Sequence, residues 1–265
     1  MHSNKWAQAS RHFSRNLTGF PRFWFAHPLF ALKLLKARME YFFTRRLAQP
    51  IATPKGFLIE TTEELVSYWS FFVERECLAS EWVNVLLSEA EPVVVDVGAN
   101  AGLFSYRIWT LKPGAKFILF EPLPRMAEKI AKWEATTGAA CTLHNKAVSD
   151  YCGTATFFAS SENDTTASLK PEPGKHLRRE LAVVTLDSII PDRPILVMKI
   201  DVEGSECEVL AGGRRTIERT RFLIIEALTK AASERIRNTL GAEWLDKQVG
   251  ATDYLFMRPT ERSPC

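Results

Sequence analysis

Residues 93–106 read VVVDVGANAGLFSY and carry the strongest fold signal in the chain. An apolar, β-branched run is interrupted only by Asp96 near its end, then come a glycine-containing turn and a helical pattern of apolar residues. A strand, a tight turn and a helix in this order bring backbone N–H groups close to a ligand at the carboxyl edge of a sheet. The stretch therefore predicts an α/β domain with a ligand site beginning at residues 96–102.

The same alternation of buried strands and helices continues towards the C-terminus. We predict strands at residues 116–121, 141–147, 195–201 and 222–226, and helices at 103–111, 125–136, 205–218 and 231–240. Such alternation is typical of a mostly parallel sheet flanked by helices. Two further strand patterns, 153–160 and 181–186, enclose a polar run at 161–176, and an insertion of this kind usually carries substrate contacts.

Length and composition favour one globular domain with an N-terminal extension. The chain has 265 residues, of which 46% are hydrophobic and 25% charged, and this excludes a disordered or low-complexity protein. A capping-box spacing of Thr61 and Glu64 predicts a helix from about Thr62, and a second helix follows at 80–90. We therefore divide the chain into an extension, 1–60, and a domain, 61–265. Five scattered cysteines without zinc-site spacing favour a reducing, cytoplasmic compartment.

Charge is distributed unevenly between these two parts. Residues 1–50 contain nine Lys and Arg against one acid, Glu40, so this segment carries +8 and the remainder 3 − 8 = −5. A basic, aromatic extension on a mildly acidic body points towards an anionic surface or a protein partner, and away from a nucleic-acid-binding body. Its acid-free start would also suit a transit peptide, an interpretation we rank below the others.

The extension is predicted to contain a helix that does not span a membrane. The apolar stretch 23–43 is interrupted by Pro28 and by charged residues, so it falls short of the roughly 20 apolar residues that a spanning helix needs. A helix from Pro28 places Lys33, Lys36, Glu40 and Thr44 on one face and Leu32, Leu35, Met39, Phe42 and Phe43 on the other. Three interpretations stay open for residues 20–48: peripheral contact with an anionic membrane, packing on the chain's own domain, or self-association.

The glycine turn disfavours a dinucleotide. A GxGxxG fingerprint beginning at Gly98 would need glycine where the chain has Asn100 and Leu103. The DxGxNxG form suits a ligand with an amino acid moiety, because Asp96 can act through the turn on an ammonium group. One strand further on, Glu121 ends its strand and can accept the hydrogen bonds of two ribose hydroxyls.

The remaining candidates also follow strands. Ala147 and Val148, after the third strand, are small enough to flank an adenine ring. Asp201 follows the buried run ILVMKI and must have a partner or ligand there. Glu203, two residues on, is either a site residue or an acidic helix start stabilised by the helix dipole. Glu226 repeats this geometry on the next strand.

In order and spacing, DVGANAGLFSY, FEPLP, NKAVSD, VVTLDSII and KIDVEGSECEVLAGG resemble the FkbM-type S-adenosylmethionine-dependent methyltransferases over about residues 80–228. The resemblance implies a class I methyltransferase (Rossmann-like) fold, S-adenosyl-L-methionine as cofactor, and methylation of a hydroxyl oxygen on a sugar, glycolipid or other natural product. It places Asp96, Gly98, Asn100 and Gly102 at the methionine end of the cofactor, Glu121 at the ribose, Ala147 at the adenine and Asp201 beside the methyl group. Because only one strand pattern, 253–258, follows the last helix, we expect the final strand hairpin of this fold to be short or incomplete.

The expected reaction needs little beyond alignment and a proton acceptor. The sulfonium makes the methyl group electrophilic, so the protein must place an acceptor oxygen in line with it and take its proton. We predict Asp201 or Glu203 as the general base, with Glu226 or His176 as alternatives, and His144 packed beside the cofactor. Two carboxylates are too few to predict a metal, so none is expected.

Two competing functions remain open. One is a non-catalytic binding protein of the same fold, associated with a membrane or a partner. The other is a dinucleotide enzyme such as a dehydrogenase, which Asn100 and Leu103 already disfavour. For the enzyme, we expect a small-molecule or carbohydrate acceptor and no nucleic acid partner.

Overall fold

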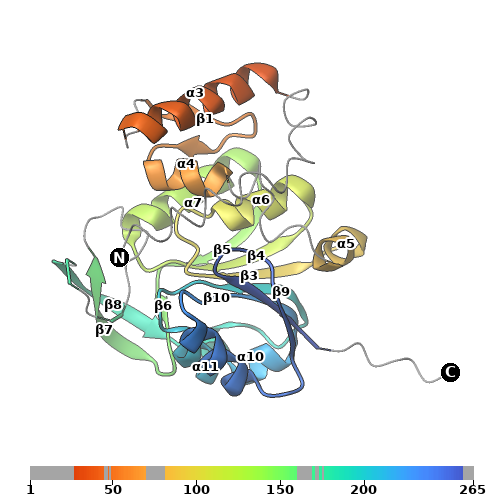
Figure 1. Cartoon of the computed structure of the whole chain (residues 1–265). Coiled ribbons are helices and arrows are strands. Elements are labelled where there is room, and N and C mark those ends of the chain that lie inside the picture. The colour runs from red at the N-terminus through yellow and green to blue at the C-terminus, as the bar shows by residue number, and fades with distance from the viewer. Residues whose placement is uncertain are drawn as a thin grey trace.

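The central element of the computed structural model is a seven-stranded sheet in the order β11-β12-β10-β9-β3-β4-β5 (Figure 1). The structure describes residues 27–44, 47, 49–69, 81–159, 169–170, 173–174 and 176–258. The strands are β3 (Val93–Val97), β4 (Lys116–Phe120), β5 (Ala140–His144), β9 (Ile195–Ile200), β10 (Thr220–Glu226), β11 (Leu245–Gln248) and β12 (Asp253–Met257). Neighbouring strands from β5 to β10 are parallel, and β12 pairs antiparallel with both β10 and β11.

The strand order reverses at β3. The chain proceeds from β3 to β4 and β5 on one side, and then returns to place β9 and β10 on the other. In open α/β sheets, ligands bind outside the carboxyl ends of the strands at such a switch point. This mostly parallel, helix-flanked sheet is the class I methyltransferase fold that the sequence predicts.

Helices cover both faces of the sheet (Figure 1). One face carries α5 (Glu81–Ser88), α6 (Leu103–Leu111) and α7 (Pro124–Thr137), and the other carries α8 (Leu186–Ile189), α9 (Glu206–Ala211), α10 (Arg214–Glu218) and α11 (Lys230–Leu240). Alternate residues of β3 supply the two cores: Val94 packs on one side, and Val95 and Val97 on the other. The fully buried strands explain the near-continuous apolar runs in the sequence.

Two sequence expectations about these elements are wrong in detail. The predicted helix at 205–218 is two helices, α9 and α10, because it breaks at Gly212 and Gly213; a Cβ on Gly212 would lie 2.1 Å from the carbonyl oxygen of Ser149. The predicted strand at 141–147 ends at His144. The final hairpin is complete but has a short strand, as expected: the four-residue β11 pairs with β12.

Beside the main sheet lies a small one, in the order β6-β8-β7. Its strands are β6 (Ala147–Val148), β7 (Gly153–Ala159) and β8 (Leu177–Val184), and β7 and β8 project at one side of the molecule (Figure 1). The predicted strand at 181–186 therefore begins earlier and ends at Val184, where Thr185 caps α8. Most of the insertion at 161–176 lies outside the described residues.

The N-terminal elements pack on the same core. The hairpin of β1 (Ile51–Ala52) and β2 (Leu58–Ile59) leads into α4 (Thr62–Trp69). The predicted capping box is confirmed: the backbone N–H of Glu64 donates to Thr61 Oγ1 at 3.2 Å, and Glu64 Oε2 accepts from the backbone N–H of Thr61 at 3.3 Å. The division at residue 60 stays a prediction.

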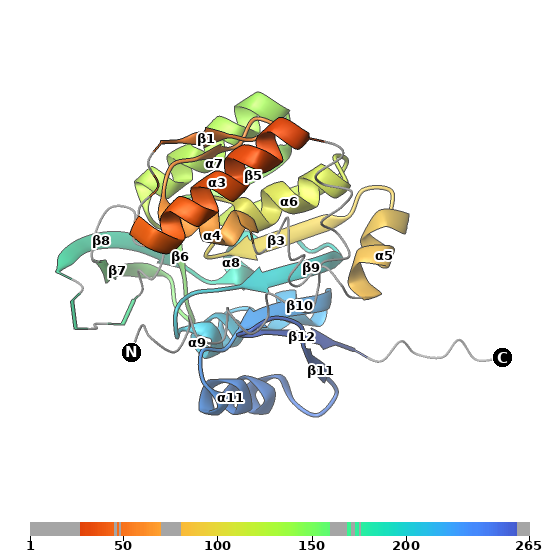
Figure 2. The ribbon, with the colours of Figure 1, turned by 45° about the horizontal axis from the view of Figure 1, so that its top comes forward.

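Helix α3 (Pro28–Thr44) lies outside α4, α6 and α7 (Figure 2). It packs on the domain through Phe30, Ala31, Leu34, Ala37 and Tyr41. The face predicted to be apolar is largely exposed, at Leu32, Met39, Phe42 and Phe43. The prediction of a helix with one apolar face and one polar face is therefore wrong, because a different set of apolar residues packs on the domain. Among the described residues, no helix has the length and apolar content needed to cross a bilayer.

Candidate functional site

The turn after β3 approaches the end of β9 so closely that only glycine fits at position 98. Gly98 has φ +79°, and a Cβ there would lie 1.9 Å from the carbonyl oxygen of Asp201. The backbone N–H groups of Gly98 and Ala99 both donate to the carbonyl oxygen of Phe120 at 3.0 Å. The turn is thereby fixed against the ends of both neighbouring strands.

Glu121 is fastened beside this turn by two backbone N–H groups. Oε2 accepts from Asn100 at 2.7 Å and Oε1 accepts from Leu123 at 2.8 Å. Asn100 has φ +52°, a left-handed conformation that non-glycine residues rarely adopt and that is typical of functional sites. Burial raises the pKa of Glu121 to about 7 despite these two hydrogen bonds. Because each carboxylate oxygen has two lone pairs, Glu121 can still accept from ligand hydroxyls.

Asp96 and Gly102 lie behind the turn. Asp96 is 1% exposed and accepts a hydrogen bond of 2.6 Å from Ser105 Oγ, which ties β3 to α6. Burial raises the pKa of Asp96 to about 6, although the nearby Lys199 ammonium opposes the shift. Gly102, with φ +78°, begins α6 where a Cβ would lie 2.6 Å from Trp133 Nε1. Both residues therefore support the turn from within.

A cleft enclosing about 540 Å³, part of it open to solvent, lies at the carboxyl ends of β3, β4 and β9. Six of the predicted site residues line it: Gly98, Asn100, Glu121, Ala147, Asp201 and Glu203. The apolar part of its wall includes Val148, from β6, and Phe157, from β7. The cleft thus combines a glycine turn, a hydroxyl-accepting carboxylate and apolar walls.

These features fit S-adenosylmethionine. Glu121 can accept the ribose hydroxyls, and Ala147, Val148 and Phe157 offer apolar surface for a planar base. Gly98 lines the cleft without a side chain, so a ligand can approach its backbone. Gly98, Asn100, Glu121 and Ala147 therefore line one cleft, whereas Asp96 and Gly102 are not among its lining residues.

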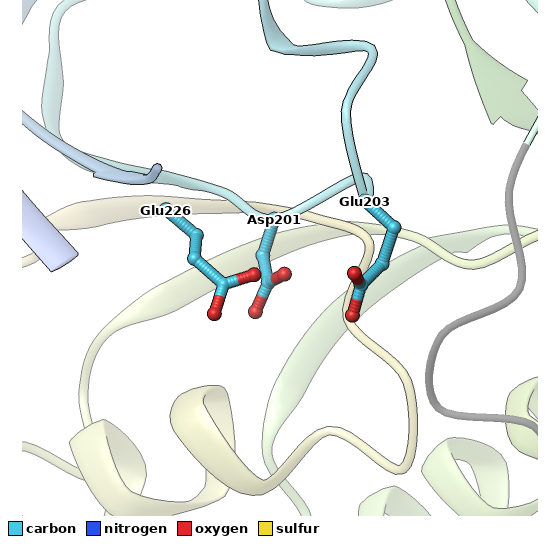
Figure 3. A group of neighbouring side chains, drawn as sticks. All are labelled: Asp201, Glu203 and Glu226. Atoms are coloured by element: carbon cyan, nitrogen blue, oxygen red, sulfur yellow. The ribbon is translucent and has the colours of Figure 1, made fainter. Parts of the chain in front are cut away.

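Three carboxylates meet where β9 and β10 end. One oxygen each of Asp201, Glu203 and Glu226 lies within 4.8 Å of the others, and the three groups point the same way (Figure 3). Burial and the charges of Asp201 and Glu203 raise the pKa of Glu226 to about 9, so its carboxyl group is protonated at neutral pH. Glu203 has φ +53°, a second left-handed residue at the cleft. The carboxyl groups of Asp201, Glu203 and Glu226 can share a proton or together hold a divalent cation.

Lys199 is the site residue that the sequence reasoning missed. Its ammonium group forms an ion pair with Asp201 Oδ2 and is almost fully buried. Burial alone would lower the pKa of Lys199, but the charges of Asp201, Asp253 and Asp96 outweigh it and raise that pKa above its usual range. The sequence did carry a signal for this ion pair. Lys199 interrupts the apolar run ILVMKI and lies two residues before Asp201, so both side chains point to the same face of the strand.

The two histidines do not join the carboxylates. His144 stacks on Phe120 with ring centroids 4.9 Å apart, and burial lowers its pKa. His176 is exposed just before β8 and is not among the described residues that line the cleft. Asn145, which was not predicted, donates from Nδ2 to the carbonyl oxygens of Glu121 and Pro122 at 2.7 and 3.0 Å and so fixes the end of β4.

Comparisons with known proteins identify the family of the chain. A family model, the methyltransferase FkbM domain, matches residues 96–252. The 2-O-methyltransferase NoeI of Sinorhizobium fredii is 32% identical over 160 residues, which are 53% of this chain and 65% of NoeI, just under two thirds of its length. The methyltransferase sdnD of Sordaria araneosa is 25% identical over 175 residues, covering 53% of this chain and 68% of sdnD.

Solved structures give more distant matches. The precorrin-6y C5,15-methyltransferase of Geobacter metallireducens has 17% identity and a TM-score of 0.37, covering 62% of this chain and 71% of that one. TrmN of Thermus thermophilus has 11% identity and a TM-score of 0.41, covering 69% and 48%.

Proposed function

The chain belongs to the FkbM methyltransferase family, and on that premise we propose that it transfers the methyl group of S-adenosyl-L-methionine to a hydroxyl oxygen. The observation that carries the proposal is the cleft at the β3 switch point, which is lined by Gly98, Glu121 and the carboxylates of Asp201 and Glu203. The acceptor is a small molecule or carbohydrate, such as a sugar or glycolipid, and not a nucleic acid. The reaction takes place in the cytoplasm.

Binding of the cofactor falls to the residues nearest the turn. Glu121 would accept hydrogen bonds from the ribose hydroxyls, and the backbone of Gly98 and Asn100 would hold the methionine portion. Ala147 and Val148 would flank the adenine. When bound, S-adenosylmethionine supplies the electrophilic methyl group. Asp96 acts through the turn on the ammonium group of the methionine portion.

The acceptor's proton goes to Asp201 or Glu203. Glu226 already holds a proton at neutral pH, because its pKa is about 9, and so it cannot serve as the base. It instead donates a hydrogen bond within the group, while Lys199 offsets one negative charge. The bound cofactor would supply the methyl group to the acceptor oxygen, and the carboxylate of Asp201 or Glu203 would hold the proton that this oxygen loses.

Oxygen as the methylated atom is supported by two observations. NoeI, the relative with 32% identity, is named a 2-O-methyltransferase. A carboxylate pair is also suited to an alcohol, which is a poor nucleophile until its proton is taken.

The test is methyl transfer from isotopically labelled S-adenosylmethionine to a panel of hydroxylated sugars and glycolipids. The product is located by NMR as a methyl ether. We expect transfer with the wild-type chain, and a loss of kcat of about 10²-fold or more with whichever of Asp201→Asn and Glu203→Gln replaces the base, because an amide cannot accept the proton. Methylation of nitrogen, or wild-type activity in both variants, would contradict the proposal.

A further inference from the structure

Helix α3 has two apolar faces, and only one of them is covered by the domain. Phe30, Leu34 and Tyr41 are buried against the core, where the ring of Phe30 meets that of Tyr68 edge-on at 5.8 Å. The outward face, which we define by its large apolar side chains, is exposed: Leu29 78%, Leu32 58%, Met39 52%, Phe42 66% and Phe43 74%. The rings of Phe42 and Phe43 contact each other with centroids 5.3 Å apart.

This concentration of apolar surface is unusual. Of the ten large hydrophobic side chains that are exposed in the described part of the chain, five lie on these 17 residues. Contiguous exposed apolar patches mark interaction sites. Figures 1 and 2 show α3 as an outer layer of the molecule, on the side away from α10 and α11, so its outward face is presented to the surroundings.

The charges beside this face select the partner. Lys33 and Lys36 are exposed on α3, and Glu40, whose Oε1 lies 3.8 Å from Lys36 Nζ, is the only acid in residues 1–50 against nine basic residues. Two copies meeting through this face would bring their lysines together, which is unfavourable. An anionic lipid surface accepts both features, because apolar side chains enter the acyl boundary and lysines remain among the headgroups.

We propose that the outward face of α3 seats the protein on an anionic membrane surface. The helix lies flat in the interface, over a length of about 25 Å at 1.5 Å per residue. Leu32, Met39 and Phe43 enter the lipid, and Lys33 and Lys36 contact its headgroups. The attachment is peripheral and reversible, and it does not depend on the methyl transfer proposed above.

The test is co-sedimentation of the full chain with vesicles of phosphatidylcholine alone or mixed with phosphatidylglycerol. We expect binding to the mixed vesicles that weakens when NaCl is raised from about 0.05 to about 0.3 M. The variant L32S/M39S/F43S should bind about tenfold or more weakly, because each large side chain contributes to lipid burial. K33E/K36E should also bind more weakly and lose much of the salt dependence.

A matched control is L87S/L245S, which removes two exposed leucines from α5 and β11, at 47% and 56% exposure, and should bind as the wild type does. Unchanged binding of L32S/M39S/F43S, or equal binding to both vesicle types, would overturn the proposal. The proposal would also be overturned if the wild type were a dimer in sedimentation velocity and L32S/M39S/F43S were a monomer, because the face would then serve self-association. Thermal unfolding of each variant shows whether its fold is intact.

Discussion

Replacing Gly98 by alanine should damage both stability and cofactor binding, and Gly138 provides a control in the same backbone conformation. Both residues have positive φ, +79° and +68°, so alanine costs about 1–2 kcal/mol at either position. A Cβ at Gly138 meets no atom within 4 Å in the described part of the chain, whereas at Gly98 it would lie 1.9 Å from the carbonyl oxygen of Asp201.

That oxygen cannot move aside cheaply. Asp201 donates its backbone N–H to the carbonyl oxygen of Val97 at 2.9 Å, and β9 is held between β3 and β10. Overpacking against fixed atoms typically adds about 1–3 kcal/mol, so Gly98→Ala should lose about 2–5 kcal/mol in all and Gly138→Ala about 1–2 kcal/mol. The turn must also shift away from Asp201, into the space proposed for the cofactor.

Urea unfolding measures the two free energies, and calorimetric titration measures S-adenosylmethionine binding by the folded variants. We expect Gly138→Ala to bind like the wild type and Gly98→Ala to bind about tenfold or more weakly, a difference of about 1.4 kcal/mol or more. Equal losses of stability in the two variants, with unchanged binding in both, would refute the argument from close approach.

Three further predictions concern the carboxylate group. Because the pKa of Glu226 is raised from 4.5 to about 9 in the folded state, the folded chain binds more protons than the unfolded chain between these two pH values, and its stability falls as pH rises. Glu226→Gln should make the fall of unfolding free energy with pH shallower, by up to about 1.4 kcal/mol per pH unit, in urea unfolding from pH 5 to 9. Lys199→Met should lower the free energy of unfolding by about 2–3 kcal/mol, which is less than the loss for a fully buried ion pair because Asp201 is 28% exposed. An unchanged free energy of unfolding in urea would show that the Lys199–Asp201 ion pair does not stabilise the fold. A proton on Glu226 and the Lys199 ammonium already compensate the cluster, so methyl transfer should survive dialysis against EDTA; activity restored only by added Mg²⁺ would instead assign the three carboxylates to a metal.

The central sheet and the cleft could be predicted because their signals are local. The helix at 103–111 has the predicted bounds. Gly98 and Asn100 follow an apolar strand interrupted only by Asp96, and Glu121 follows the continuous apolar run FILF. A glycine turn after such a run marks the carboxyl edge of a sheet wherever the strands end up in space. The positions of these residues in the cleft therefore required no knowledge of the tertiary structure.

The features that the sequence did not predict are those that depend on contacts between distant parts of the chain. Strand β11 has the sequence LDKQ, and all four residues are exposed, so no apolar alternation marks it. Helix α3 is apolar on several sides, and periodicity alone cannot tell which side the domain covers. The raised pKa of Glu226 depends on β10 lying beside β9, with Ile225 paired to Ile200, and that register joins residues far apart in sequence.

The most direct test of the account is calorimetric titration of the wild type and of Glu121→Ala with S-adenosylmethionine and S-adenosylhomocysteine, with NAD as a control. The wild type should bind both sulfur compounds one-to-one and should not bind NAD, and Glu121→Ala should bind both sulfur compounds about tenfold or more weakly. Tight binding of NAD, or the same S-adenosylmethionine affinity in both proteins, would contradict it.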